Sequence, residues 1–198
     1  DEMGPPPDMP PPEMPDPGMP HPMGRPPVAE KKPVGIEVKP FEPVPAEAVL
    51  ARIPETGMYS KGLLDELKSA TGHQRLSVRE AAILTLGQIV DLAPEAERQA
   101  VEAETMAHLE RLAADANTAV AAAAVRAAAV VAGDKAAPML ADKIGHSDPI
   151  VRAAVLQAAA SLPKPDPEIL KKGLADKEPA VVVRALELAL SFKDLPDL

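Results

Sequence analysis

The chain has 198 residues, a formal net charge of −9 at pH 7 and no cysteine. The negative charge argues against nucleic acid or an anionic membrane as the main ligand, and the lack of cysteine excludes disulfides and thiolate metal sites. The longest apolar run, residues 119–132, is interrupted by Arg126 and is too short and too alanine-rich for a membrane span.

The chain begins at Asp1, without an initiator methionine. An acidic, proline-rich start is typical of a chain from which a signal peptide has been removed, so we expect an exported, periplasmic protein in preference to a cytoplasmic one. A trimmed chain is the alternative explanation of this start.

Residues 1–45 are predicted to form an extended arm, because they hold 16 of the chain's 25 prolines. Each proline fixes φ, lacks an N–H donor and keeps the preceding residue out of the helical region, which favours a polyproline-type strand. Methionines recur every four to six residues and offer flexible apolar side chains to the pockets of a partner. The arm residues that we expect to bind a partner are Met3, Met9, Met14, Met19, Met23 and Phe41.

Three hypotheses compete for this arm: a disordered spacer, an interaction arm that becomes ordered on a partner, and a copper site. The copper hypothesis rests on Met19, His21 and Met23, because two thioethers and one imidazole suit Cu(I). The intervening prolines stiffen the loop and only one histidine is present, so we expect no metal and no cofactor. Residues 34–39 alternate apolar and polar side chains and could add to a sheet as an edge strand.

Residues 46–59 are predicted to form a short helix and a turn that lead into a repeat domain at residues 60–198. The whole chain has three aromatic residues, so the core of that domain must consist of Ala, Val and Leu, which favours closely packed helices. Four segments align on a valine with intervals of 42, 31 and 30 residues, which is typical of a solenoid of helical hairpins. The aligned valines are Val78, Val120, Val151 and Val181.

The alignment predicts two helices for each repeat. The first helices are expected at about residues 61–71, 98–115, 135–145 and 167–175, and the second helices at about 78–92, 118–132, 149–162 and 179–193.

Capping residues support these boundaries. Asp148 or Ser147 is expected to cap a helix that starts at Pro149, and Pro179 is expected at the corresponding start of the last helix. Ser77 and Glu80 fit a capping box. Gly72 and Gly145 are expected to end first helices with a positive φ.

Three helix entries resemble the second-helix entry of HEAT repeats, including the bilin-lyase-like subgroup: Ser77–Ala82, Asp148–Ala154 and Asp176–Val181. The resemblance covers about two thirds of the chain. It implies an all-α fold, a short right-handed α-solenoid of about four HEAT-like hairpins preceded by the arm.

The resemblance also implies a ladder between neighbouring repeats, made by an Asp before the turn and an Arg just after the aligned valine. Asp148 and Arg152 match this pattern, whereas Arg79 matches without its Asp. Ala121 and Val182 stand where the other two arginines are expected. We therefore expect an incomplete ladder, with alanine-mediated close approach in the middle of the stack.

The second helices are unusually apolar: Arg126 is the only charged residue between Ala119 and Ala132. One interpretation is that alanine tolerates exposure and simply favours helix. The other is that this face is covered by a partner or by the chain's own arm. On the solenoid, the residues that we expect to contact a partner are Arg126, Arg152 and Gln157.

No sequence pattern indicates catalysis. His73 and His146 follow Gly72 and Gly145 in equivalent turns, and we interpret them as loop residues or as the rim of a contact surface. Glu104 and His108 are four residues apart on a helix, a spacing that gives a surface pair more often than a metal site.

We therefore expect a non-catalytic scaffold or accessory subunit that binds other proteins of a larger assembly through its solenoid and its arm. No nucleic acid, membrane insertion or small-molecule substrate is expected. The alternatives are a bilin-lyase-like HEAT-repeat enzyme, implied by the subgroup resemblance alone, and an exported copper-binding protein.

Overall fold

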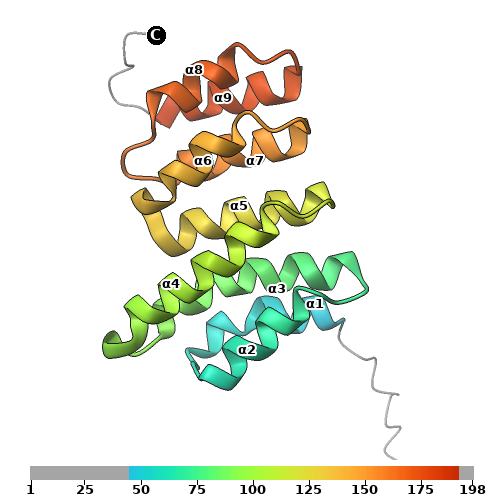
Figure 1. Ribbon diagram of the computed structural model, residues 1–198, viewed down its shortest axis with the longest axis vertical. Helices are drawn as coiled ribbons and strands as arrows, with labels where there is room; N and C mark the ends of the chain where they lie inside the picture. Colours follow the sequence, from blue (N-terminus) through green and yellow to red (C-terminus); the bar gives the residue numbers. More distant parts are fainter. Residues whose placement is uncertain (1–44, 192–198) are drawn as a thin grey trace, which may run out of the picture. The chain divides into compact units, whose positions relative to one another are not determined.

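The computed structural model describes residues 45–191, and every regular element in that range is a helix (Figure 1). The predicted arm, with its methionines and Phe41, lies outside the described residues, as does the possible edge strand at residues 34–39. The α-helices are α1 (Ala46–Arg52), α2 (Lys61–Ala70), α3 (Leu76–Ile89), α4 (Glu95–Leu112), α5 (Thr118–Ala132), α6 (Ala137–Lys143), α7 (Pro149–Ala160), α8 (Pro167–Leu174) and α9 (Pro179–Ser191). Short 3-10 turns cover Pro54–Thr56, Val90–Leu92 and Gly133–Ala136.

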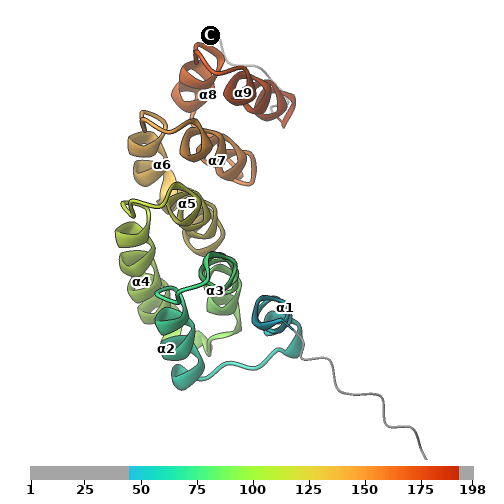
Figure 2. The same cartoon turned by 90° about the vertical axis from the view of Figure 1, so that its right-hand side faces the viewer.

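The helices pack as four hairpins, α2–α3, α4–α5, α6–α7 and α8–α9. The second helices α3, α5, α7 and α9 stack directly on one another, and the first helices lie on one side of this column (Figure 2). Helix α1 packs on α3, so it occupies the place that a second helix of a preceding hairpin would take. The prediction of an all-α solenoid of four hairpins is confirmed.

The alanine-rich helix α5 is covered by its own neighbours. Ten of its fifteen residues are buried, because α3, α4 and α7 pack around it. Alanines allow this approach: a Cβ built on Gly87 of α3 would lie 3.2 Å from Cα of Ala127. Most alanines of α5 are therefore covered by the neighbouring helices, and they are neither exposed to solvent nor available to a partner.

The aligned valines all belong to the core: Val78 is 4% exposed, and Val120, Val151 and Val181 are fully buried. Five residues further along each second helix, Ile83, Val125 and Leu156 are also fully buried. The fourth residue in this register, Leu186, is 54% exposed. In each earlier hairpin, the next hairpin packs on this surface of the second helix. In the last described hairpin the same surface is exposed at Leu186.

The expected positive φ at Gly72 and Gly145 is wrong. In the described residues, only Gly57 and Gly133 have a positive φ. Helix α2 ends through three-residue turns, in which Gly72 N–H donates to Ser69 O and His73 N–H to Ala70 O, and α6 ends in the same way. Such a 3-10 turn needs no left-handed residue.

Candidate functional site

One loop position repeats in every hairpin, five residues before the aligned valine. The residues there are His73, Asp115, His146 and Asp176, and each accepts a hydrogen bond from the backbone N–H two residues later. For His73 and His146 the acceptor is Nδ1, at 3.1 and 3.0 Å. Both histidines therefore act as loop residues that fix the entry into the second helix.

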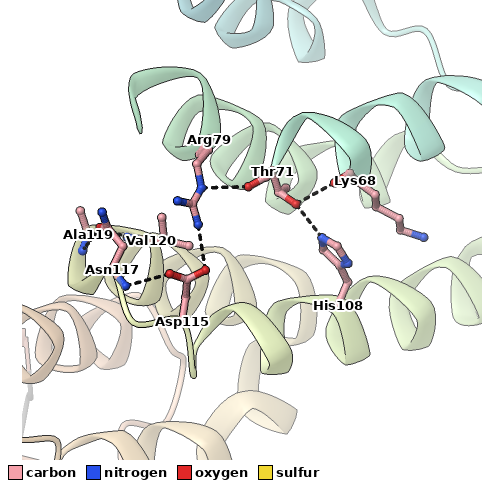
Figure 3. Close-up of polar contacts among 8 residues, drawn as sticks. All are labelled: Lys68, Thr71, Arg79, His108, Asp115, Asn117, Ala119 and Val120. Carbon is pink, nitrogen blue, oxygen red and sulfur yellow. Dashed lines mark hydrogen bonds and ion pairs between the residues drawn. The ribbon is translucent and has the colours of Figure 1, made fainter. Parts of the chain in front are cut away.

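An arginine of one hairpin reaches the aspartate of the next at this position. Arg79 donates from Nη2 to Asp115 Oδ2 at 2.8 Å and from Nε to the carbonyl oxygen of Thr71 at 3.1 Å (Figure 3). Arg152 bonds Asp176 with two nitrogens, and its Nη1 donates to the carbonyl oxygens of His146 and Ser147. Each arginine thus ties its own turn to the following repeat.

The pair Arg152–Asp176 is buried, with both side chains 8% exposed. The bond from Arg152 holds the pKa of Asp176 below its usual value, and the same bond raises the pKa of Arg152. Both groups therefore stay charged at neutral pH. The burial also corrects one expectation: Arg152 is a residue of the ladder and is not available to a partner.

The ladder aspartate is not the residue that the sequence indicated. Asp148 caps α7 by accepting from Ile150 N–H at 2.8 Å, and Pro149 is the first residue of that helix. The aspartates of the ladder come from the following repeat, as Asp115 and Asp176 do. Between the second and third hairpins the ladder is absent, because Ala121 replaces the arginine and His146 the aspartate.

The predicted capping box at Ser77 and Glu80 is wrong. Helix α3 begins at Leu76 with Arg75 as its N-cap, so Ser77 already lies in the first turn. Its hydroxyl donates to Glu47 Oε1 at 3.4 Å, and Arg75 also donates to this carboxylate, at 3.1 Å. These residues attach α1 to α3. In the last hairpin, Pro179 is the first residue of α9.

His108 joins α4 to the end of α2. The Thr71 hydroxyl donates to the carbonyl oxygen of Lys68, so it accepts from His108 Nε2, 3.0 Å away (Figure 3). His108 Nδ1 then accepts from Arg111. This arrangement requires the neutral imidazole, and burial, helped by Arg111 and Lys68, lowers the pKa of His108. Glu104 bonds Lys68 at 2.6 Å, so the expected pair of Glu104 with His108 does not form.

Arg126 and Gln157 come together on the solvent side of the second helices. They line a groove of about 200 Å³ between α5 and α7, which we call the α5–α7 groove; its other lining residues are Val130, Ala158 and Ser161. Arg126 is half-buried and has no ion-pair or hydrogen-bond partner among the described residues. Val130 is 53% exposed. Here a half-buried cation and an apolar side chain face solvent together.

A second hollow of about 430 Å³ lies beside α1, at the N-terminal end of the described stack. It is lined by Val49, Arg52, Ile53, Glu55 and Thr56. The arm's own candidate residues, Met19, His21 and Met23 among them, lie outside the described part of the chain.

Within residues 45–191, no group of three or more His, Cys, Asp or Glu side chains is placed to hold a metal ion. In the same range, none of the helices has the length and apolar character needed to cross a membrane.

Residues 105–191 match the family model described as HEAT repeats. The matched segment begins inside α4 and ends with α9, so it contains the stacked second helices α5, α7 and α9 and both residues of the buried ladder pair. The HEAT resemblance is thereby confirmed for the entries Asp148–Ala154 and Asp176–Val181, whereas Ser77–Ala82 lies outside the matched segment. Comparison with curated proteins and with solved structures finds no significant match.

Proposed function

We propose that this protein, whose residues 105–191 match HEAT repeats, is a non-catalytic scaffold or accessory subunit that holds other proteins in a larger assembly. HEAT repeats mediate protein–protein interactions, and the hairpins here are joined by buried apolar contacts into one stack. The α5–α7 groove is the proposed main contact, and the proline-rich arm is the proposed second one.

The observation that carries this proposal is the unpaired Arg126 in the α5–α7 groove. A half-buried arginine has already lost part of its hydration, so a carboxylate brought by a partner gains a strong, charge-assisted bond there. Arginine beside exposed apolar area is also typical of residues that dominate protein interfaces. The neighbouring Val130 and Gln157 supply an apolar and a hydrogen-bonding contact. The partner should therefore present an acidic residue flanked by apolar side chains.

The roles of the other polar residues support a non-catalytic function. His73 and His146 bind loop backbone, and His108 is held between Thr71 and Arg111. Arg79, Arg152 and their aspartates hold neighbouring hairpins together. These side chains are already occupied by structural bonds, which leaves Arg126 and Gln157 of the groove as the groups best suited to bind something else.

The arm would act by tethering. Two weak contacts on one chain raise the effective concentration of the second once the first has formed, without any new contact. An extended proline-rich segment loses less conformational entropy on binding than a flexible linker of the same length. The stack would therefore fix one subunit while the arm reaches another.

Photo-crosslinking from single positions tests this proposal. A photoreactive amino acid at Val130 of the full chain, added to extract of the native source, should capture one defined protein, and Arg126→Glu should abolish that capture. The matched control is the same amino acid at Ala103, which is exposed on the opposite layer in α4. Equal capture from both positions, or capture that survives Arg126→Glu, would contradict a site in the groove.

A further inference from the structure

Helix α9 of the last described hairpin presents a row of exposed apolar side chains. Val183, Leu186 and Leu190 are 52%, 54% and 88% exposed, and their spacing of three and four residues places them along one side of α9. Single exposed apolar residues are ordinary on protein surfaces, whereas an aligned set of three indicates a contact surface. We call these three residues the α9 stripe.

The repeat register shows what such a stripe contacts inside the stack. Leu156, the equivalent of Leu186 in the preceding hairpin, is fully buried under the next repeat. Leu156 packs directly against Gly173 of α8. An ideal Cβ built on Gly173 would lie 2.7 Å from Leu156 Cδ2. The same face of α9 is therefore built to receive another helix, and no described residue covers it.

The arrangement of side chains on α9 is complementary to a second copy of itself. Val183 and Leu190 lie three residues before and four residues after Leu186, so in an antiparallel pairing centred on Leu186 the valine of one copy meets Leu190 of the other. Arg184 lies two residues before Leu186 and Glu187 one residue after, so each arginine approaches the glutamate of the second copy. Both side chains are about half exposed, 49% and 53%, and among the described residues they pair with each other along their own helix.

We propose that the α9 stripe is a homodimer interface, in which two chains pack α9 against α9 in antiparallel orientation about a two-fold axis. Such an isologous contact uses the same surface on both copies, and two-fold dimers are the commonest closed oligomers. The dimer would place two α5–α7 grooves and two arms in one particle. This inference does not depend on the proposed scaffold function, because it uses a different surface.

Analytical ultracentrifugation of the full chain over a range of concentrations tests the proposal. The chain should show a reversible monomer–dimer equilibrium, and Leu186→Glu should weaken it by at least about tenfold, since it would bury a charge in the contact. The matched control is Ile150→Glu, because Ile150 is also 54% exposed but lies on α7. Circular dichroism should show that both variants keep the helical fold.

Charge exchange tests the orientation. Arg184→Glu and Glu187→Arg should each weaken the dimer, and a mixture of the two variants should associate again, because both cross-pairs are then complementary. The intrahelical pair cannot explain that recovery.

A chain that remains monomeric throughout would overturn the proposal, as would equal weakening by Ile150→Glu or no recovery in the mixture. A dimer that forms only after removal of residues 192–198 would also overturn it, because the chain's own end would then be the occupant of the stripe.

Discussion

Arg152 and Asp176 form a two-bond ion pair across the boundary of the third and fourth hairpins, with N···O distances of 2.6 and 2.8 Å. Arg79 and Asp115 occupy the same two register positions one boundary earlier in the chain. At the remaining boundary, both partners are replaced together, by Ala121 and His146. The arginine and the aspartate therefore occur as a pair or not at all, which is what burial demands, since either charge alone would be costly.

Removing one member of the buried pair should destabilise the stack strongly. Arg152→Met leaves the carboxylate of Asp176 buried without its counter-charge, and such a loss typically costs about 3–5 kcal/mol. Asp176→Asn in addition should recover part of that loss, because Asn keeps an acceptor for Glu178 N–H without the charge. Urea unfolding monitored by circular dichroism measures both free energies.

Two other ion pairs, whose side chains are more exposed, serve as comparisons for the stability cost of Arg152→Met. Arg79→Met should cost less than Arg152→Met, because the side chains of Arg79 and Asp115 are 22% and 26% exposed and solvent screens the charge left behind. Lys135→Ala breaks the pair with Glu102, in which the lysine is 73% exposed, and should change stability by about 1 kcal/mol or less. Equal costs for all three variants would contradict a special role for burial.

The stability of the first two hairpins should fall on mild acidification because of His108. Its pKa is lowered in the folded chain, mainly by burial, so the unfolded chain binds protons more readily and stability rises with pH. The contribution of His108 is fully present above its unfolded pKa, about 6.5, and is lost as pH falls from there through the lowered folded value. Protonation at Nδ1 would also remove the acceptor that Arg111 uses.

The free energy of unfolding should therefore be measured from about pH 8 down to about pH 5.5, where carboxylates remain largely ionised in both states. His108→Gln should flatten this dependence, because glutamine can donate to Thr71 but does not titrate. The comparison concerns the slope and not the absolute stability. An unchanged slope in His108→Gln would assign the pH dependence to other groups.

The sequence predicted helices well because their signals are local. Pro149 and Pro179 start helices where expected, and the aligned valines identify the buried face. The ladder partner was misassigned because two aspartates, Asp148 and Asp176, are consistent with the motif, and only packing decides which one faces Arg152. The capping box at Ser77 failed for a related reason: His73 fixes the loop, so α3 starts earlier.

The alanine run of α5 shows a different limit of sequence reasoning. Alanine is compatible with an exposed helix and with a buried one, so its periodicity does not reveal that three helices surround α5. The groove residues Arg126 and Gln157 were found because they interrupt such runs. The α9 stripe was missed, although the register signal was available: Leu186 is aligned with Ile83, Val125 and Leu156, each of which lies under a following hairpin.

Gly173→Ala should destabilise the boundary between the third and fourth hairpins. An added Cβ would lie 2.7 Å from Leu156 Cδ2 and 2.9 Å from Ala185 Cβ, and the latter atom is fixed by its backbone. Overpacking of this kind costs about 1–3 kcal/mol, which outweighs the gain of up to about 1 kcal/mol in helix propensity. Gly62→Ala in α2 is the control, because its nearest atom lies 4.0 Å away, and it should be slightly stabilising. If Gly173→Ala were also stabilising in thermal unfolding, the contact would be looser than the structure describes.

Deleting residues 1–44 should separate folding from binding. The buried apolar residues of the described part run from Leu64 to Leu188, so the deletion should leave the helical content and the unfolding midpoint unchanged. Capture of the protein crosslinked from Val130 should weaken by about 100-fold or more if the arm supplies the second contact of a tethered pair.

Replacing the five methionines Met3, Met9, Met14, Met19 and Met23 by serine keeps the length and the prolines of the arm, so this variant tests whether the methionine side chains make that contact. If the shortened chain captures its partner as well as the full chain does, the arm is only a spacer. If the deletion weakens capture but the serine variant does not, the prolines and not the methionines make the contact.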